Sequence, residues 1–203
     1  MSETPPTSRS VPRQERSQQT YDLVLRVAGE LLAEVGMDSI STNMICARAG
    51  VTPPALYRYF DDKHAVLEAL GRRLMSRQND VLEQWIARYE PGGIMMLRAH
   101  IIDLLRDTAR VTASEPGAVW ILRALHASPR LVHVRVESHR YVTDRLAEVC
   151  ARHLPDADTV TLWQRLRLAV EIGFAVDEML GEEDRIPAET ALGYAAGILQ
   201  AAL

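Results

Sequence analysis

The segment Ile40–Leu70, ISTNMICARAGVTPPALYRYFDDKHAVLEAL, decides the fold, because it places two short helices around a glycine turn and leads directly into a third helix. Ser41 precedes an apolar-periodic stretch and is placed to cap it by accepting a hydrogen bond from a backbone N–H. Gly50 tolerates the left-handed backbone that ends this helix. Thr52 and Pro53 then suit the N-cap and first turn of a second helix of roughly two turns.

Apolar positions in the same segment predict which faces of the two helices point inward. Ile45 and Ala49 lie one turn apart on the first helix, and Leu56 and Phe60 lie one turn apart on the second. The second helix therefore presents small and aromatic residues on its other faces. Two helices joined in this way form a helix-turn-helix, whose second helix can enter the major groove of DNA.

The segment resembles the TetR (tetracycline-repressor) family of bacterial transcriptional regulators over about residues 18–70. The chain departs from the family pattern at Cys46, where alanine is usual, and at Pro54, where many members have glycine. Neither departure changes the predicted fold. The resemblance rests on the helix before the motif and on Thr42, Ile45, Ala49, Gly50, Val51, Thr52, Leu56, Tyr57, Arg58, Tyr59, Phe60, Lys63, Val66 and Leu67.

The resemblance implies that both short helices and the start of the third contact DNA. Phosphate contacts are implied for Thr42, Tyr57, Tyr59 and Lys63, although either tyrosine could instead serve only to pack helices together. Base or near-base contacts are implied around the start of the second helix, where few hydrogen-bond donors favour contact with thymine methyl groups. The complete implied set is Thr42, Asn43, Thr52, Pro53, Pro54, Ala55, Tyr57, Arg58, Tyr59 and Lys63.

Charge limits the kind of nucleic-acid binding that the chain can support. The 203 residues carry a formal net charge of −4, and 47% of them are hydrophobic, which supports a substantial core. Residues 1–75 hold nine basic and nine acidic side chains, and residues 76–203 hold fourteen and eighteen. This balance argues against a generally basic nucleic-acid coat protein. Affinity for DNA must therefore come from local placement of cations, hydroxyls and helix N-termini, and from two subunits acting together.

Other sequence features limit the compartment and the chemistry. Cys46 and Cys150 are too few for a disulfide framework or a Cys-rich zinc site, which indicates a reducing compartment. Residues 1–16 lack an apolar leader and no run is apolar enough to span a membrane, so we expect a cytoplasmic protein, associated with the nucleoid when bound to DNA. The chain lacks a phosphate loop, a metal-ligand pair and an acid-base dyad, so we expect no enzyme activity, cofactor or metal.

Periodicity predicts an all-α chain of about nine helices. Residues 1–16, rich in Ser, Thr, Pro and Arg, are expected to form a disordered tail, from which Arg9, Arg13 and Arg16 either reach a minor groove or stay solvated. Residues 17–68 form the predicted three-helix DNA-binding domain, and residues 69–203 form a larger helical bundle for effector binding and dimerisation. Helices are predicted over about residues 18–35, 63–89, 94–112, 116–127, 129–153, 159–180 and 188–203, besides the two short helices.

The last two helices suit dimerisation, because they combine small residues with apolar ones. The resemblance implies a four-helix interface formed by these two helices from each subunit, whereas the alternative is that they close the monomer's own core. The residues concerned are Leu192, Gly193, Ala195, Ala196, Gly197, Ile198, Leu199 and Leu203 on the last helix, and Leu162, Leu166, Ala169, Val170, Gly173, Phe174 and Val176 on the preceding one.

The resemblance also implies a pocket for a small effector in the middle of the bundle. Aromatic and methionine residues there are candidates for its lining, although such residues are often ordinary core. An acidic run near residues 177–184 hints at a cationic effector, but a solvated turn is the alternative. The candidate lining residues are Trp85, Met95, Met96, Trp120, His126, Tyr141 and Trp163.

Together these features favour a ligand-responsive DNA-binding transcriptional regulator. The favoured form is a repressor that binds a palindromic operator as a homodimer and is released by a small, largely apolar effector. A helical interaction module without DNA binding remains an alternative, and an α-helical enzyme is a weaker one.

Overall fold

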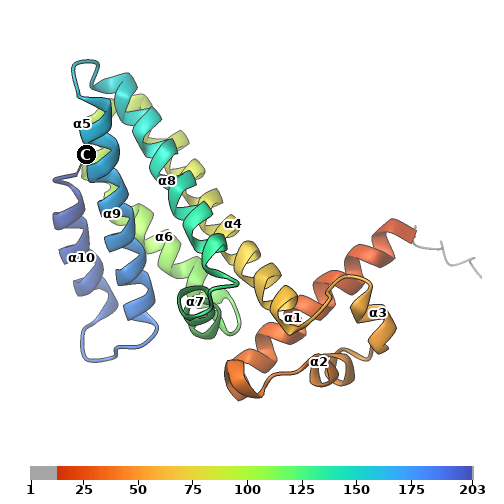
Figure 1. The fold of residues 1–203 in the computed structure, drawn as a ribbon. Coiled ribbons are helices and arrows are strands. Elements are labelled where there is room, and N and C mark those ends of the chain that lie inside the picture. Colours follow the sequence, from red (N-terminus) through yellow and green to blue (C-terminus); the bar gives the residue numbers. More distant parts are fainter. Residues whose placement is uncertain (1–12, 203) are drawn as a thin grey trace, which may run out of the picture.

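A computed structural model describes residues 13–202, with side chains from residue 16 onward, and no strand occurs among them. The all-α prediction is confirmed. Figure 1 shows α1 to α3 gathered at one end and the remaining helices forming a longer bundle, with α4 running between the two parts. The elements are α1 Arg13–Ser39, α2 Thr42–Ala49, α3 Pro53–Tyr57, α4 Lys63–Tyr89, the 3-10 helix η1 Glu90–Gly92, α5 Gly93–Ala99, α6 Ile101–Ser114, α7 Ala118–Ala127, α8 Val132–His153, α9 Thr159–Leu180 and α10 Ala188–Leu199.

Helix α1 is longer than the predicted helix over residues 18–35. It begins at Arg13, so residues 13–16, expected in the disordered tail, are helical. The extension has a physical reason, because Ser17 Oγ lies 2.7 Å from the Tyr59 hydroxyl and holds the start of α1 against the segment after α3. Gly36 has φ +73° and interrupts the regular helix as predicted, but another turn follows. Arg9 and the side chain of Arg13 lie outside the described residues.

Helices α2 and α3 form the predicted glycine-turn pair. Ser41 Oγ accepts a hydrogen bond from the Met44 N–H at 3.3 Å, and Gly50 ends α2 in the left-handed region with φ +64°. Thr52 occupies the N-cap of α3, but its side chain makes no capping hydrogen bond. Helix α3 has five residues rather than two full turns, because the Leu56 carbonyl accepts hydrogen bonds from the N–H groups of two residues beyond the helix and turns the chain toward α4.

The long helix α4 has the bounds that the sequence predicts. Asp62 caps it by accepting a hydrogen bond from the Ala65 N–H at 2.9 Å, and its 27 residues span about 40 Å. The single helix expected over residues 94–112 is instead divided at His100 into α5 and α6, which raises the number of α-helices in residues 13–202 to ten. The His100 carbonyl is held by the Trp85 indole N–H at 2.8 Å, and its ring stacks on Tyr89.

The remaining helices match the prediction with shifted ends. Helix α7 begins at Ala118 rather than at residue 116, because Gly117 takes a left-handed φ of +74°. Helix α8 begins at Val132, three residues later than predicted, and α10 ends at Leu199 rather than at residue 203. Within residues 13–202, no helix is both long and apolar enough to cross a membrane.

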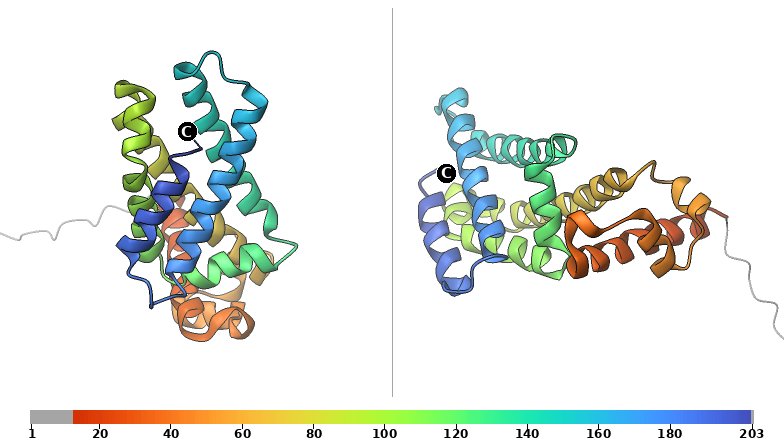
Figure 2. Two further views of the ribbon diagram at one scale, coloured as in Figure 1. Left: turned by 90° about the vertical axis from the view of Figure 1, so that its left-hand side faces the viewer. Right: turned by 60° about the horizontal axis from the view of Figure 1, so that its bottom comes forward.

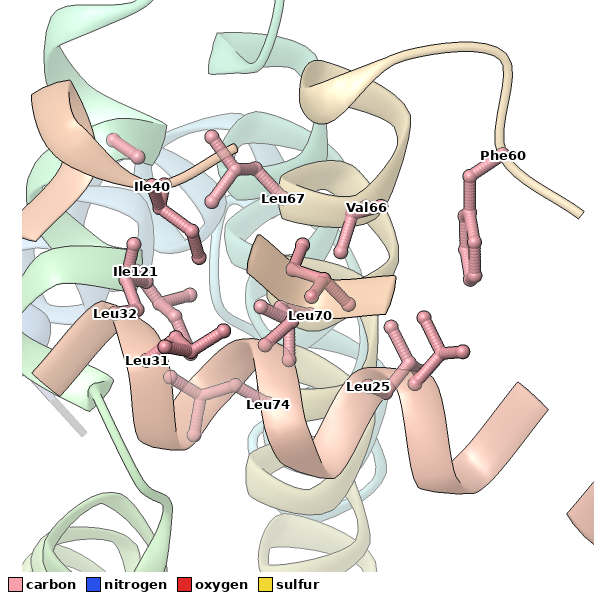
Figure 3. Packing of buried hydrophobic residues seen from close by; sticks show 14 of the residues in the cluster. Leu25, Leu31, Leu32, Ile40, Phe60, Val66, Leu67, Leu70, Leu74 and Ile121 are labelled. Carbon is pink, nitrogen blue, oxygen red and sulfur yellow. The ribbon is translucent and has the colours of Figure 1, made fainter. Parts of the chain in front are cut away.

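Buried apolar side chains form two clusters, and α4 belongs to both. The first cluster joins α1, α2, α3, the first half of α4, α7 and the start of α8, and Figure 3 shows Ile121 of α7 beside Leu31 and Leu32 of α1. The second joins the rest of α4 to α5, α6, α8, α9 and α10. Figure 2 shows α7 against the end of α1, so the predicted boundary after residue 68 crosses one continuous apolar cluster. We call α1 to α3 with the start of α4 the head, and the remaining helices the body.

Two glycines with positive φ offer a matched test of this packing. A Cβ added at Gly117 would lie 2.6 Å from the Gly29 carbonyl oxygen on α1, whereas a Cβ at Gly50 would meet nothing within 4 Å. Gly50→Ala should lower the free energy of unfolding by about 1 kcal/mol through backbone strain alone. Gly117→Ala should lower it by about 1–3 kcal/mol more, because a steric clash is added. Urea unfolding of both variants measures the difference, and equal losses would contradict the packing of α7 on α1.

Candidate functional site

One exposed surface of the head collects the implied DNA-binding residues of α2 and α3. The hydroxyls of Thr42 and Tyr57 lie 3.1 Å apart, which joins the start of α2 to the end of α3. Tyr57 is 47% exposed, so packing does not account for most of its side chain. Asn43, Pro53 and Pro54 are also exposed. The contact between Thr42 and Tyr57 therefore connects the exposed residues of α2 to those of α3.

The remaining implied residues are distributed around this surface. Thr52 and Arg58 are exposed and Ala55 is half-buried. The Arg58 guanidinium carbon lies 5.6 Å from the centroid of the Tyr59 ring, within cation–π distance. Because Arg58 makes no ion pair in the described chain, its charge is available at the edge of the surface.

Tyr59 and Lys63 have partners within the head. Tyr59 lies edge-on to Tyr21, with ring centroids 6.0 Å apart, and its hydroxyl contacts Ser17. Lys63 Nζ donates a hydrogen bond to the Met37 carbonyl at 3.2 Å. Both residues thus tie α1 to the segment that follows α3, and a phosphate contact from either stays a prediction.

The seven candidate effector residues do not come together in one pocket of the described chain, and their role in effector binding stays a prediction. One of the seven lines the apolar cavity between α4, α6, α8, α9 and α10. Several of the other side chains lie on outer helix faces, where their polar atoms have partners within the chain. Met95 and Met96 are exposed on α5, Tyr141 bonds to Glu83, Trp163 bonds to Asp144, His126 pairs with Glu178, Trp120 borders a separate hollow beside α7, and Trp85 lines the apolar cavity.

An apolar cavity, which we call the body cavity, lies between α4, α6, α8, α9 and α10. Its volume is about 80 Å³, and most of its wall is apolar. Trp85, Leu105 and Phe174 are among its larger lining residues. Three polar side chains interrupt this apolar wall, namely those of Gln78, Thr108 and Asp177. An apolar cavity with a few converging polar groups is the usual form of a small-molecule site.

A buried hydrogen-bonded set, which we call the polar layer, consists of Gln78 on α4, Thr112 on α6 and Asp177 on α9. Gln78 Nε2 donates to Asp177 Oδ2 at 3.0 Å and lies 2.8 Å from Thr112 Oγ1. The Thr112 hydroxyl lies 2.7 Å from the same carboxylate oxygen. Gln78 and Asp177 are only 3% and 7% exposed. The layer thus connects three helices at the junction of the two apolar clusters.

Burial dominates the electrostatics of Asp177. Desolvation raises the pKa of its carboxyl to about 6, even though hydrogen bonds from Thr112 and Gln78 act to lower it. The negative charge of the adjacent Glu178 also contributes to the raised pKa of Asp177. No cation pairs with Asp177 in the described chain, so the ionised carboxylate is buried without a counter-charge.

The helical spacing of residues in the sequence could have predicted the polar layer. Gln78 continues the inner face of α4 four residues after Leu74. Asp177 stands seven residues after Val170 on the inner face of α9, and Thr112 stands seven after Leu105 on that of α6. A polar residue on an apolar stripe is buried, whereas the acidic composition near residue 177 suggested a solvated turn.

The residues predicted for dimerisation separate onto two faces. Leu162, Leu166, Leu192 and Leu199 are buried in the second apolar cluster, so they close the monomer's own core. The opposite face carries Gly193 and Gly197, which have open space beside them. Large exposed apolar side chains occur on both helices, and we call the outer surface that carries them the α9–α10 face: Leu168 on α9, and Tyr194 and Ile198 on α10, exposed by 64%, 73% and 60%.

Parts of the chain are similar in sequence to known bacterial regulators. Residues 24–70 match the sequence model described as bacterial regulatory proteins, tetR family. The chain is 41% identical over 101 residues to the tetracycline repressor protein class A from transposon 1721 of Escherichia coli, covering 47% of this chain and 46% of that one. The chain thus spans about half the length of that relative.

Two further comparisons extend beyond the head. The HTH-type transcriptional regulator BetI of Escherichia coli O17:K52:H18 is 28% identical over 143 residues, covering 69% of this chain and 70% of BetI. A crystal structure of a TetR-family transcriptional regulator from Streptomyces coelicolor has a TM-score of 0.64 at 22% identity, covering 90% of this chain and 96% of that one. This structural likeness establishes the fold.

The polar layer generates a prediction for stability against pH. Because the pKa of Asp177 is raised from 3.8 to about 6 on folding, its contribution to stability is fully present below about pH 4 and is lost as the pH rises through 6. Asp177→Asn should therefore gain stability relative to the wild type by about 2 kcal/mol between pH 4.5 and pH 7.5. Urea unfolding at both pH values measures this gain. The exposed Asp156→Asn is the control, and an equal Asp177→Asn effect at both pH values would contradict the burial of an ionised group.

Proposed function

We propose that this chain is a homodimeric repressor of a palindromic operator. The premise is that it belongs to the TetR family of bacterial transcriptional regulators and carries a DNA-binding helix-turn-helix. A small, largely apolar effector in the body cavity releases it from the DNA. The observation that carries this proposal is α4, which begins in the head and lines the cavity near its other end. A single rigid element thus connects the two sites.

In this proposal the surface of α2 and α3 contacts DNA. The start of α3 enters the major groove, where Pro53, Pro54 and Ala55 contact base edges. The Thr42 and Tyr57 hydroxyls are close enough to bind one phosphate group together. Arg58 adds charge at the edge of the surface. The absence of strong cation density in the head makes binding by two heads necessary for useful affinity.

The α9–α10 face supplies the proposed dimer contact. Leu168 and Ile198 expose apolar area that a second copy of the chain would cover, and Gly193 and Gly197 allow close approach of helices. A two-fold axis through this face carries two heads to half-sites about 34 Å apart, which is one turn of DNA. Figure 1 shows α10 at the outer edge of the body, with α9 between α10 and α8.

Release follows if effector binding changes how α4 packs. Glu115, in the segment between α6 and α7, is buried and forms ion pairs with Arg73 and Arg77 of α4. The neighbouring Gly117 packs on Gly29 of α1. An effector that shifts α6 or α4 therefore acts on the head through direct contacts, and a coupling of about 1–3 kcal/mol is enough for regulation.

The first test measures DNA binding directly. Fluorescence anisotropy against DNA from the protein's own upstream region, at two salt concentrations, should give saturable and salt-sensitive binding. Tyr57→Ala should weaken it by about tenfold or more, because a hydrogen bond to a charged phosphate contributes about 1.5–3 kcal/mol. Tyr57→Phe should lose most of the same affinity if the hydroxyl is responsible. Tyr141→Ala, an exposed tyrosine of the body, is the matched control.

Retention of full affinity by both Tyr57 variants would contradict the assigned DNA surface. If no specific binding is found upstream, a genome-wide pull-down with the wild type and Tyr57→Ala separates a distant operator from an interaction module. Fragments that the wild type enriches and the variant loses would support the regulator, whereas equal recovery would favour the module.

The second test concerns the dimer. Leu168→Glu combined with Ile198→Glu should convert the dimer to a monomer, because each subunit would bring two charges into an apolar contact. Analytical ultracentrifugation measures the change, and operator affinity should fall with it. Met95→Glu, another exposed apolar residue but on α5, should leave the dimer intact. A dimer that survives the double substitution would place the interface elsewhere.

A further inference from the structure

We propose that the cavity selects an effector with an apolar body and a cationic nitrogen, and that Asp177 is the counter-ion of that nitrogen. The inference rests on the proposed function, because it specifies the chemical class of the effector for the same cavity. Its basis is the set of hydrogen-bond acceptors that the polar layer leaves without partners.

The polar layer uses only half of its oxygen acceptors. Asp177 Oδ2 accepts from both Gln78 and Thr112, but Asp177 Oδ1 has no hydrogen-bond partner in the described chain. Gln78 Oε1 is equally without a partner. Both atoms are buried, and both side chains line the cavity. Two buried acceptors at one end of an apolar cavity require a donor, since an unsatisfied buried oxygen is costly.

Charge selects the kind of donor. The groups that face Asp177 from α4 and α6 are the neutral Gln78 and Thr112, and the neighbouring charge on α9 is Glu178. Beyond Thr112, the carboxylate of Glu115 is already paired with Arg73 and Arg77. The site therefore lacks positive charge. An anionic ligand would face a buried carboxylate, and a neutral alcohol would supply one donor but no charge, whereas an ammonium group supplies both.

The rest of the wall determines the body of the ligand. Away from the polar layer the cavity is lined by aliphatic and aromatic side chains of α4, α6, α8, α9 and α10, including Trp85, Leu105 and Leu166. Burial of a hydrocarbon chain against this surface is favourable, and it leaves no polar group without a hydrogen-bond partner. A linear amine therefore matches the cavity, with its nitrogen at the polar layer and its chain along the apolar wall.

The test compares matched probes on the full-length protein. We would titrate short n-alkylamines of about three to five carbons, and the n-alkanols of the same lengths, by isothermal calorimetry and by tryptophan fluorescence, to which Trp85 in the cavity wall contributes. In the wild type an amine should bind about 10- to 100-fold more tightly than the alcohol of equal length, as expected for a charge-assisted hydrogen bond. In Asp177→Asn this preference should disappear while alcohol affinity is retained. Glu178→Gln, which removes the adjacent charge outside the cavity wall, should keep the preference.

Three results would overturn the inference: equal binding of amine and alcohol by the wild type, a preference that survives in Asp177→Asn, or no binding of any probe. If water alone satisfies the two buried acceptors, the amine and the alcohol should bind equally or no probe should bind. The proposed function has a separate readout, because operator binding is measured without any probe. If the wild type binds its operator but shows no preference for amines, it remains a DNA-binding regulator without a cationic effector. If it does not bind an operator, the proposed regulatory function is contradicted.

Discussion

The buried hydrogen bonds of Gln78 to Thr112 and Asp177 are the constraint on which the rest of the structure depends. They lie where the apolar cluster around Leu74 ends and the one around Leu82 begins, so they mark the junction of head packing and body packing on α4. Apolar contacts alone tolerate sliding of one helix along another. Directional hydrogen bonds do not, because a shift of about 1 Å breaks them and leaves buried groups unpaired. The polar layer therefore sets the position of α4 relative to α6 and α9.

From this layer, contacts lead to the head along two routes. One is α4 itself, which continues from Gln78 to its cap at Asp62. The other follows α6 from Thr112 to Glu115, whose ion pairs with Arg73 and Arg77 return to α4, and then reaches α1 through the packing of Gly117 on Gly29. Because α7 also belongs to the first apolar cluster, the head shares its core with the body. A change at the polar layer therefore alters the supports of the head from two sides.

Local cues in the sequence predicted much of the fold, and tertiary contacts account for the rest. Caps such as Ser41 and the left-handed Gly50 act within a few residues, so the helix-turn-helix was predictable. The break at His100 depends on an indole N–H fifteen residues away, and the early start of α1 depends on Tyr59. The proposed DNA-contacting surface was predicted from a resemblance confined to the head. The lining of the cavity was not predicted, because residue size cannot distinguish the buried Trp85 from Trp163, whose indole bonds to Asp144 at the surface. Helical periodicity, in contrast, would have placed Asp177 on the inner face of α9.

The same carboxylate that limits stability also gives the cavity its selectivity. An ionised Asp177 without a counter-charge disfavours the folded state, and a ligand that neutralises it binds the folded state alone. Regulation needs more than affinity, because a ligand that binds two arrangements of α4 equally well does not shift the equilibrium between them. Asp177 Oδ2 is the acceptor for Gln78 and Thr112, so a nitrogen that draws the carboxylate toward itself competes with the bonds that position α4. Recognition of the effector and displacement of the helix would then be one event, with its geometry set by a single side chain.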